Sequence, residues 1–490
     1  DQWIPIRPGT DAAMLVAMAY VLIKEGLHDE VFLSRYTFGF ERFKDYCLGA
    51  EDGVAKTPAW AEGICGVRAE VISNLAREYA ATRPADLRGG WSPGRTIYGE
   101  QFHRACIALS AMTGNIGVPG GGPGCWVSFD SRRFLGVSNL PTGENPTGRS
   151  IVGWKWADAV LRGTAGGYPS DIKMVFSIGG NRLGQCGDIN KGIEALKKVE
   201  FVVVQDQFLT PMARYADIVL AASTHFERED IQVPRNLGNA IIFNHRVVEP
   251  IGEARSDLDI LSALAERLGF PEFKNKTEDG WLVELIRGGP VNYSTLRTGG
   301  VYRPEKKLPQ IPLQQFIQNP DQNPLPTPSG KIEIFSQTLA RRQDPMLPPV
   351  PKYLGPGEVQ VNEGGREFPL LLITPHSKMR VHSTFANIPW LEEIEPHTAW
   401  ISVADAEARG IRDGNSIKVF NEIGTLVIKA RVTERIMPGT IGIYQGTWHR
   451  LDPLGQDWGG SVNVLCRDTY SPGEAAPTNA VPVEAARLEE

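Results

Sequence analysis

The first candidates for chemistry are polar side chains that follow two apolar runs in the middle of the chain. Gly179-Gly180-Asn181 follows the run 173–178, and Asp206 follows the run 200–205 in Gln205-Asp206-Gln207. Ligands of open parallel sheets bind beyond the carboxyl ends of the strands. Glycines there let a ligand approach the backbone, and the Asp206 carboxylate can accept hydrogen bonds from the amino and ring N–H groups of a guanine. A loop asparagine and a helix-capping aspartate are the structural alternatives.

Two further segments could meet an anion. Arg7-Pro8-Gly9-Thr10-Asp11 opens a predicted helix, so its backbone amides face any anion bound there, and Asp11 offers a second carboxylate. Its structural alternative is an ordinary N-cap by Thr10 or Asp11. The glycine-rich run 114–124 could cradle phosphates, but it has no Walker lysine, so an irregular loop explains it equally well.

The segment Thr374 to Ser383 concentrates donors directly after a predicted strand. Lys378 and Arg380 suit phosphate or pterin oxygens, whereas His376 and His382 are six residues apart, a poor spacing for a metal pair on a helix or a strand. Solvated surface charge is the alternative. His382 and Ser383 are neighbours that point to opposite faces of a strand, which argues against a hydrolase triad.

The totals describe an ordinary globular chain. Its 490 residues predict two to four domains, and a formal net charge of −6 with 22% charged residues gives no reason to expect nucleic acid as a partner. The most apolar stretch, 12–23, is about half as long as a membrane-spanning helix, so we expect a buried helix and no membrane span. The six cysteines form no Cys-x-x-Cys pair, so we expect buried or idle thiols and no metal cluster held wholly within these residues.

The first residues have neither an initiator Met nor a signal peptide, and they resemble the end of a strand. We therefore expect the chain to be a segment of something longer.

The elements that position these residues predict α/β domains with doubly wound parallel sheets, followed by a β-barrel. We expect helices at 12–24, 68–81, 100–112, 189–197 and 257–268, and buried strands at 173–178, 200–205 and 218–222. Prolines crowd 304–356, broken by a strand at 331–335, which indicates a linker. Short strands follow at 370–374, 416–421, 425–432 and 440–444, with a hairpin turn at 421–424.

These segments, in this order, resemble the molybdopterin oxidoreductases of the dimethyl sulfoxide reductase family. Residues 3–11 are similar to the family segment that meets one guanine of bis(molybdopterin guanine dinucleotide), and residues 205–220 are similar to the segment that meets the other. Residues 252–257 and 327–333 match two further family stretches. The resemblance covers essentially the whole chain, and its details are closest to the quinol-linked dimethyl sulfoxide reductase catalytic subunits.

The resemblance implies the fold and the cofactor contacts. It implies that the last domain is a six-stranded barrel of the double-psi type. The implied domains are an α/β part at 1–85, a second α/β domain at 86–303, a linker at 304–364 and the barrel at 365–490. Implied cofactor-binding residues are Gly9, Thr10, Asp11, Gly90, Trp91, Asn181, Gln205, Asp206, Arg228, Asp257, Thr374, His376, Lys378, Arg380, His382, Ser383, Asn463 and Asn479.

The resemblance further implies oxygen-atom transfer at molybdenum or tungsten, with a sulfoxide or N-oxide as the substrate. It places an iron–sulfur cluster and the metal ligand before Asp1, and it implies an iron–sulfur electron-transfer subunit, a membrane-anchor subunit and a periplasmic location. Alternatives are another substrate (thiosulfate, polysulfide or selenate), a non-redox hydratase or transhydroxylase, or an inactive cofactor-binding fragment. A NAD-linked dehydrogenase is disfavoured because no Gly-x-Gly-x-x-Gly follows a strand.

The chain departs from the dimethyl sulfoxide reductase subunits at two positions. Those subunits usually carry a glutamine near Gly94 and a proline at the position of Ala221. Neither change removes a charge, but both weaken the expectation of the same substrate.

Overall fold

The computed structural model describes residues 1–125, 132, 135–234, 239–305, 311–355 and 368–489. It divides into two compact units. Unit 1 combines residues 1–127, 186–190 and 310–490, and unit 2 combines residues 128–185 and 191–309. Parts of the expected linker, 306–310 and 356–364, lie outside the described residues.

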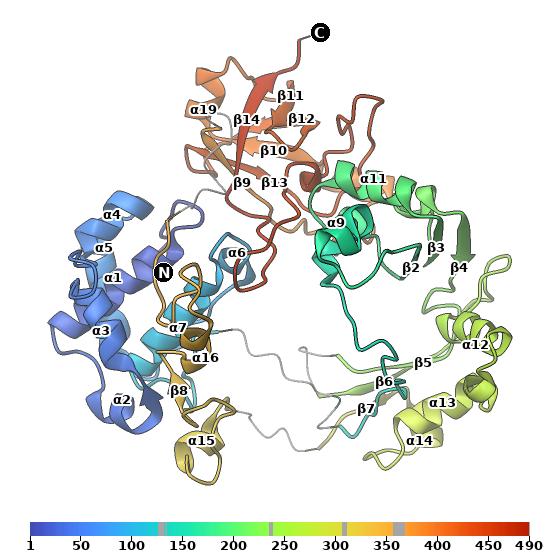
Figure 1. The fold of residues 1–490 in the computed structure, drawn as a ribbon, viewed down its shortest axis with the longest axis horizontal. Coiled ribbons are helices and arrows are strands. Elements are labelled where there is room, and N and C mark those ends of the chain that lie inside the picture. The colour runs from blue at the N-terminus through green and yellow to red at the C-terminus, as the bar shows by residue number, and fades with distance from the viewer. Residues whose placement is uncertain (126–131, 133–134, 235–238, 306–310, 356–367, 490) are drawn as a thin grey trace. The chain divides into compact units, whose positions relative to one another are not determined.

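The first part of unit 1 is a helical cluster around α1 (Asp11–Lys24), which is apolar over most of its surface and almost entirely buried. A helix that is apolar on all sides needs partners on all sides, and α1 lies alongside four other helices (Figure 1). Their large buried side chains include Phe43, Ile72 and Leu109. The helices of this part are α1, α2 (Glu30–Tyr36), α3 (Phe40–Leu48), α4 (Pro58–Cys65), α5 (Ala69–Ala81), α6 (Trp91–Gly94) and α7 (Glu100–Met112).

The strand expected at 331–335 shortens to β8 (Ile332–Glu333), which pairs in parallel with β1 (Thr37–Phe38). This pair joins the helical cluster to the proline-rich segment, which also carries α15 (Gln314–Gln318) and α16 (Gln337–Arg342).

The second part of unit 1 is a closed barrel of six strands, as the resemblance implies, although the sequence pattern itself predicts only four of these strands. Going round the barrel, the strands are β10 (Thr398–Ile401), β12 (Thr425–Val432), β11 (Ser416–Phe420), β14 (Val481–Arg487), β9 (Leu370–Ile373) and β13 (Thr440–Ile443). The expected hairpin joins β11 to β12: the Asn421 amide donates to the Gly424 carbonyl at 3.1 Å, and its side-chain oxygen accepts from the Ile423 and Gly424 amides. Short helices α18 (Pro389–Ile394) and α19 (Val403–Ala408) flank β10.

Unit 2 contains the parallel sheet, formed by β2 (Met174–Ile178), β3 (Phe201–Asp206) and β4 (Ile218–Ala221). The expectation that all three strands are buried was wrong. Only the central strand β3 is buried, and many residues of the edge strands β2 and β4 are exposed, because an edge strand is covered by a neighbour on one side only. The predicted helix α11 (Ile189–Lys198) connects β2 to β3 after the short α10 (Arg182–Gln185).

The rest of unit 2 comprises a small antiparallel sheet and further helices. The strands are β5 (Asp230–Gln232), β6 (Ile241–Asn244) and β7 (Val301–Tyr302), and the helices are α9 (Trp156–Arg162), α12 (Asp257–Arg267), α13 (Glu278–Leu285) and α14 (Tyr293–Gly299). Phe243 of β6 packs with Leu282 and Leu296 of the last two helices. The Ser256 side chain caps α12: its hydroxyl oxygen accepts a hydrogen bond from the Asp259 amide at the start of this helix.

The two units divide the chain differently from the expected domains. Residues 86–127 belong to unit 1, because α7 packs on α1. The short segment 186–190 also belongs to unit 1, because the Asp188 amide donates to the carbonyl oxygens of Asn463 and Cys466 at 2.9 and 2.7 Å. Within the described part of residues 1–85, the regular elements are helices and the two-residue β1.

Candidate functional site

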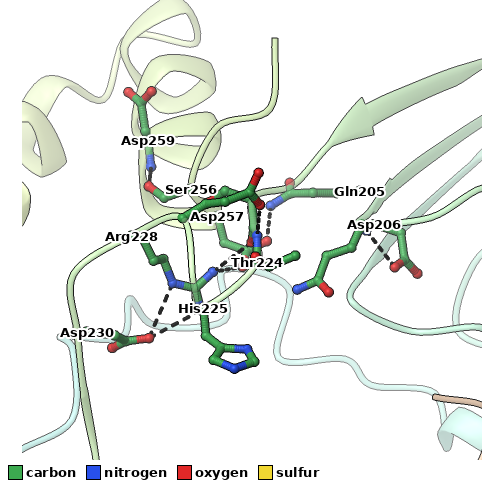
Figure 2. A network of polar contacts seen from close by, with 12 residues as sticks. Gln205, Asp206, Thr224, His225, Arg228, Asp230, Ser256, Asp257 and Asp259 are labelled. Carbon is green, nitrogen blue, oxygen red and sulfur yellow. Dashed lines mark hydrogen bonds and ion pairs between the residues drawn. The ribbon is translucent and has the colours of Figure 1, made fainter. Parts of the chain in front are cut away.

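A polar network lies at the carboxyl end of β3 in unit 2 (Figure 2). Gln205 is fully buried, and its side-chain Nε2 donates to Oδ1 of Asp257 at 2.7 Å. Its Oε1 is also buried and has no hydrogen-bond partner among the described residues. A buried amide oxygen without a donor costs about 1–3 kcal/mol, so this atom calls for a partner that a ligand could supply.

Arg228 holds the outer side of this network. Its guanidinium donates to both the Ser223 carbonyl at 3.0 Å and Oδ2 of Asp230 at 3.2 and 3.3 Å, and it lies 3.6 Å from Oδ2 of Asp257. Asp257 is therefore held between Gln205 and Arg228, at the first turn of α12. Sequence reasoning missed Asp230, although the Arg-x-Asp spacing at the start of β5 was a usable signal.

The Asp206 carboxylate follows Gln205 at the end of β3 and is half-buried. Its Oδ1 accepts from the Gln207 amide at 2.7 Å. Burial raises the pKa of Asp206, and the neighbouring Asp257 raises it further, while backbone amides of the following residues oppose the rise. Among the described residues, the Asp206 carboxylate forms no ion pair, and it would gain from additional N–H donors.

Asn181 lies at the end of the adjacent strand β2, and it is 4% exposed. Both polar atoms of its side-chain amide are buried without a hydrogen-bond partner among the described residues. Gly184 allows this close packing, because a Cβ at that position would lie 2.6 Å from the Asn181 Nδ2. Buried polar groups in native proteins are almost always paired, so two orphaned atoms on one side chain indicate a ligand contact.

A cavity of about 450 Å³ lies beside the network in unit 2. Its lining includes Ser223, Arg228, Ser256, Asp259 and Trp281. The volume falls within the range of small-molecule sites.

In unit 1, the segment Gly9-Thr10-Asp11 leads into α1 as expected, and Thr10 is the N-cap residue, one of the two residues predicted for that position, but its side chain makes no capping hydrogen bond. Instead, the Thr10 hydroxyl donates to the Arg7 carbonyl at 2.6 Å. Burial raises the pKa of Asp11 to about 6 and outweighs the favourable contact with its own amide. Gly9 has φ +80°, and a Cβ there would lie 3.2 Å from Cβ of Ala480.

That contact places the α1 entrance next to the predicted residue Asn479, which precedes Ala480. The Asn479 side-chain oxygen accepts from the Thr374 amide at 2.7 Å and from the Thr374 hydroxyl at 3.1 Å. The Asn479 amide donates to the Arg95 carbonyl at 2.9 Å. Gly9, Thr374 and Asn479, which are far apart in the sequence, are thus neighbours within unit 1.

Gly90 and Trp91 lie at the start of α6, a few residues before Arg95, whose carbonyl accepts from the Asn479 amide. Trp91 is 65% exposed, and the Arg95 guanidinium lies 5.9 Å from its ring centre. The imidazole of His103 occupies the space beside Gly94: a Cβ at Gly94 would lie 2.4 Å from its Nε2. The sequence showed that a glycine is unusual at position 94, but it did not identify His103 as the residue that occupies the space beside it.

The donor-rich loop Thr374 to Ser383 follows β9 and has no helix or strand of its own. Ser377 Oγ and the Lys378 amide both donate to one carboxylate oxygen of Glu395, at 2.5 and 3.0 Å. The rings of His376 and His382 touch, with centroids 4.8 Å apart, which helix or strand spacing did not anticipate. Glu395 fixes the loop, and it was missed from the sequence.

The remaining predicted side chains on this loop differ in exposure. Lys378, His376 and His382 are exposed, Arg380 and Ser383 are partly buried, and the Ser383 carbonyl accepts from the indole N–H of Trp448 at 3.0 Å. The Nε atom of Arg380 is buried without a hydrogen-bond partner in the described part of the chain. Arg380 therefore has donor capacity that the protein does not use.

Asn463 is buried in a short 3₁₀ turn after the glycine pair 459–460. A fully buried carboxylate, Asp457, holds the loop before it. Its two oxygens accept from the backbone amides of Arg450, Gly459 and Ser461 at 2.5–2.8 Å. Sequence reasoning missed Asp457, since a single acidic residue in a loop carries no spacing signal.

The predicted residues thus fall into two groups, one in each unit. Asn181, Gln205, Asp206, Arg228 and Asp257 share unit 2, and the others belong to unit 1. Among the described residues, no group of three or more histidine, cysteine, aspartate or glutamate side chains could hold a metal ion. Five of the six thiols are buried and Cys125 is half-buried, and no helix in the described ranges is long and apolar enough to cross a membrane.

Comparison with known proteins gives two family matches. Residues 1–267 match the family described as molybdopterin oxidoreductase, and residues 370–482 match the molydopterin dinucleotide binding domain. The first match covers more than half of the chain, and together they span both units.

Among curated relatives, the chain is 37% identical to dimethyl sulfoxide reductase DmsA of Escherichia coli K12, over 99% of this chain and 65% of that protein. It is 36% identical to the dimethyl sulfoxide/trimethylamine N-oxide reductase of Cereibacter sphaeroides, over 94% of this chain and 61% of that one. The chain therefore spans just under two thirds of the length of these relatives. A solved structure, acetylene hydratase from Pelobacter acetylenicus, shares the fold, with a TM-score of 0.74 and 22% identity over 100% of this chain and 72% of that one.

Proposed function

The chain belongs to the molybdopterin oxidoreductase family, and from this membership we propose that it is part of the catalytic subunit of a reductase of sulfoxides or N-oxides. The names of the relatives support this substrate class, since they include dimethyl sulfoxide reductases and a dimethyl sulfoxide/trimethylamine N-oxide reductase. The proposed cofactor is bis(molybdopterin guanine dinucleotide) with molybdenum.

The observation that carries the proposal is the set of buried polar atoms without partners at the carboxyl edge of the parallel sheet. They are both side-chain polar atoms of Asn181 and Oε1 of Gln205. A ligand rich in hydrogen-bond donors and acceptors, such as a guanine nucleotide, would satisfy both kinds of atom, so these residues fit the cofactor. When bound, the molybdenum centre supplies oxygen-atom transfer and accepts the electrons that the reaction consumes.

In this proposal, the residues of this chain bind the cofactor and fix its orientation. In unit 2, Asp206 would accept the N–H groups of one guanine, next to Gln205, which Asp257 keeps in place at 2.7 Å. In unit 1, Asp11 would accept those of the other guanine. Lys378 is exposed, and Arg380 has an unused donor, so both would balance the negative charge of phosphate or pterin oxygens.

Purification of the complete protein tests the proposal directly. We expect molybdenum and releasable guanine nucleotide in the preparation, and we expect reduction of a sulfoxide or N-oxide with a reduced dye as electron donor. Active protein that contains neither molybdenum nor guanine nucleotide would refute the cofactor. Turnover of a substrate without any electron donor would refute the reductase and favour a hydratase or transhydroxylase.

A matched pair of variants on strand β3 sharpens the test. Asp206→Asn removes the carboxylate at the carboxyl end of the strand, and Glu200→Gln removes a carboxylate just before its amino end, where Glu200 forms an exposed ion pair with Lys173 at 3.3 Å. Because hydrogen bonds to charged groups contribute about 1.5–3 kcal/mol, Asp206→Asn should release guanine nucleotide roughly 10- to 100-fold faster. Glu200→Gln should retain it like the wild type, and equal retention by both variants would contradict the role of Asp206.

The same proposal includes partners and a location. We propose an iron–sulfur cluster in the complete protein, an iron–sulfur electron-transfer subunit and a membrane-anchor subunit as its partners, and a periplasmic location. Copurification from solubilised membranes with a protein that carries iron and acid-labile sulfide would support this arrangement. Quantitative recovery from the cytoplasmic fraction would contradict it.

A further inference from the structure

His397 lies between the loop Thr374 to Ser383, which the resemblance places at the cofactor, and the glycine pair 459–460, which precedes the predicted residue Asn463. It stands just before β10, outside both segments. Its Nδ1 is 3.3 Å from the Nη2 of Arg380 in the loop after β9, and its Nε2 is 2.9 Å from the carbonyl oxygen of Gly460. The Thr447 hydroxyl lies 3.1 Å from Nε2 and 3.4 Å from Nδ1.

The partners of His397 determine which ring nitrogen carries the proton. A carbonyl oxygen can only accept, so Nε2 must carry a hydrogen and donate to Gly460. A guanidinium can only donate, so Nδ1 must be the unprotonated nitrogen that accepts from Arg380. The ring is therefore neutral and has one fixed tautomer, and its two nitrogen atoms contact two different loops.

Charges around the ring favour this neutral form. Burial, together with the positive charge of Arg380, lowers the pKa of His397 to about 4, although the hydrogen bond to the Gly460 carbonyl acts in the opposite direction. Burial lowers the pKa of Arg380, while the nearby Glu392, Glu395 and Tyr444 oppose this shift by favouring the charged guanidinium. The ring thus stays neutral and the guanidinium stays charged at neutral pH.

The backbone at Gly460 is built for this contact. Gly460 has φ +76°, and a Cβ there would come within 2.8 Å of the imidazole. A glycine permits both the left-handed backbone and the approach of the ring. The Asp457 carboxylate holds the same loop through the Gly459 and Ser461 amides at 2.8 and 2.5 Å, so the carbonyl that His397 meets is itself fixed.

We propose that His397 is a positioning residue that aims the Arg380 guanidinium at the cofactor and couples this arginine to the Gly460 loop. The inference rests on the proposed function, because it assumes that an anionic cofactor meets Arg380. Nδ1 restrains one end of the guanidinium, while the Nε atom on its other side is buried without a partner among the described residues. A restrained guanidinium loses less freedom on binding an anion, which strengthens the contact without any contact between His397 and the ligand.

The alternative is that His397 only fills space in the wall of the barrel. Substitutions at this position distinguish that role from the proposed one. His397→Phe keeps a ring of similar shape but removes both hydrogen bonds, whereas His397→Gln keeps one donor and one acceptor. His28→Phe is the matched control, because His28 is also enclosed and its Nδ1 contacts the Leu22 carbonyl at 3.3 Å, in the helical part of the unit.

The experiment measures the rate at which guanine nucleotide and molybdenum leave the purified complete protein. We expect His397→Phe to raise that rate roughly tenfold, His397→Gln to stay within about twofold of wild type, and His28→Phe to have no effect. In a protein that already carries Arg380→Met, His397→Phe should add nothing, because both changes remove the same interaction.

Three results would overturn the inference. They are unchanged release from His397→Phe, equal loss from His397→Gln and His397→Phe, and additive losses in the double variant. If His397→Phe does not fold, His397→Gln and Arg380→Met still test the proposal. Fast release of guanine nucleotide from Arg380→Met, together with near wild-type release from His397→Gln, supports it. Any other pattern refutes it. A wild-type protein that holds no guanine nucleotide would instead refute the proposed function, so the two failures differ.

Discussion

Replacement of Asp11 by asparagine should stabilise the cofactor-free protein at neutral pH. Asp11 opens α1 inside the helical cluster, near the thiols of Cys65 and Cys106, whose pKa values its charge helps to raise. Its first-turn position contributes about 0.3–1 kcal/mol through the helix dipole. The cost of burying the carboxylate exceeds this gain, since burial is the largest influence on its pKa and raises it.

The magnitude follows from the pKa. Asp11 moves from its ordinary value of 3.8 to about 6 in the folded protein, which corresponds to about 3 kcal/mol. The folded state binds this proton more tightly than the unfolded state, so stability falls as pH rises from about 4 to about 6 and stays reduced above that range. The asparagine side chain of the Asp11→Asn variant cannot ionise and escapes this loss. The variant should thus gain about 2 kcal/mol over wild type at pH 7.5, after the smaller helix-dipole contribution is subtracted.

Urea unfolding of the cofactor-free chain at several pH values between 4 and 8 measures this difference. Asp45→Asn, on the exposed side of α3, is the control for the loss of an ordinary carboxylate in the same unit. The difference between Asp11→Asn and wild type should be small at pH 4 and should grow with pH, and it should grow more than the difference between the control and wild type. A constant difference across the whole range would refute the reasoning, because only titration of a buried Asp11 produces the pH dependence.

Three further predictions concern the barrel and the α6 turn. Asn421→Ala should lower the free energy of unfolding by about 2–4 kcal/mol in urea titrations, because its side-chain Nδ2 donates to the Leu465 and Pro482 carbonyls at 2.9 and 3.2 Å; a loss below about 1 kcal/mol would contradict this. Gly94→Ala should lower the melting temperature by several degrees through its clash with His103, and adding His103→Ala should restore most of it; no restoration would exclude the clash as the cause. Asp457→Asn should increase hydrogen exchange in residues 450–461, measured by mass spectrometry, because one amide oxygen cannot serve three backbone donors; unchanged exchange would show that the loop does not depend on this carboxylate.

Periodicity and end signals explain why much of the fold could be predicted. The helix at 100–112 and the strand at 425–432 have the predicted bounds, because each combines a regular apolar pattern with turn residues at both ends. The strands β10 and β14 were missed, since Thr398–Ile401 is too short for a pattern and Val481–Arg487 begins next to a proline. The exposure of β2 and β4 could not be predicted, because apolar composition says nothing about which strand lies at an edge.

The candidate site shows a similar limit. Gln205, Asp206 and Asp257 could be proposed from their places after a strand and before a helix, and Gln205 and Asp257 are directly bonded in the structure. Glu395 and His397 could not be proposed, because each acts on a predicted residue 17 positions away in the chain through a tertiary contact. A sequence identifies the residues that directly follow a strand or precede a helix. It identifies the residues that contact and fix them only when these partners are close in the chain.

The pairing of β1 with β8 has a consequence for the order in which the protein folds during synthesis. Thr37 pairs with Ile332, about 300 residues later in the chain, and all of unit 2 is made between them. At ribosomal speeds of about 5–20 residues per second, the helical cluster waits roughly 15–60 seconds for its last strand. During that interval α1 and its partners form an incomplete core, whereas most of unit 2 can already collapse. We expect chaperones that bind nascent chains to be needed most in this interval, and ribosome profiling of chaperone-bound chains should show their release only after β8 has emerged.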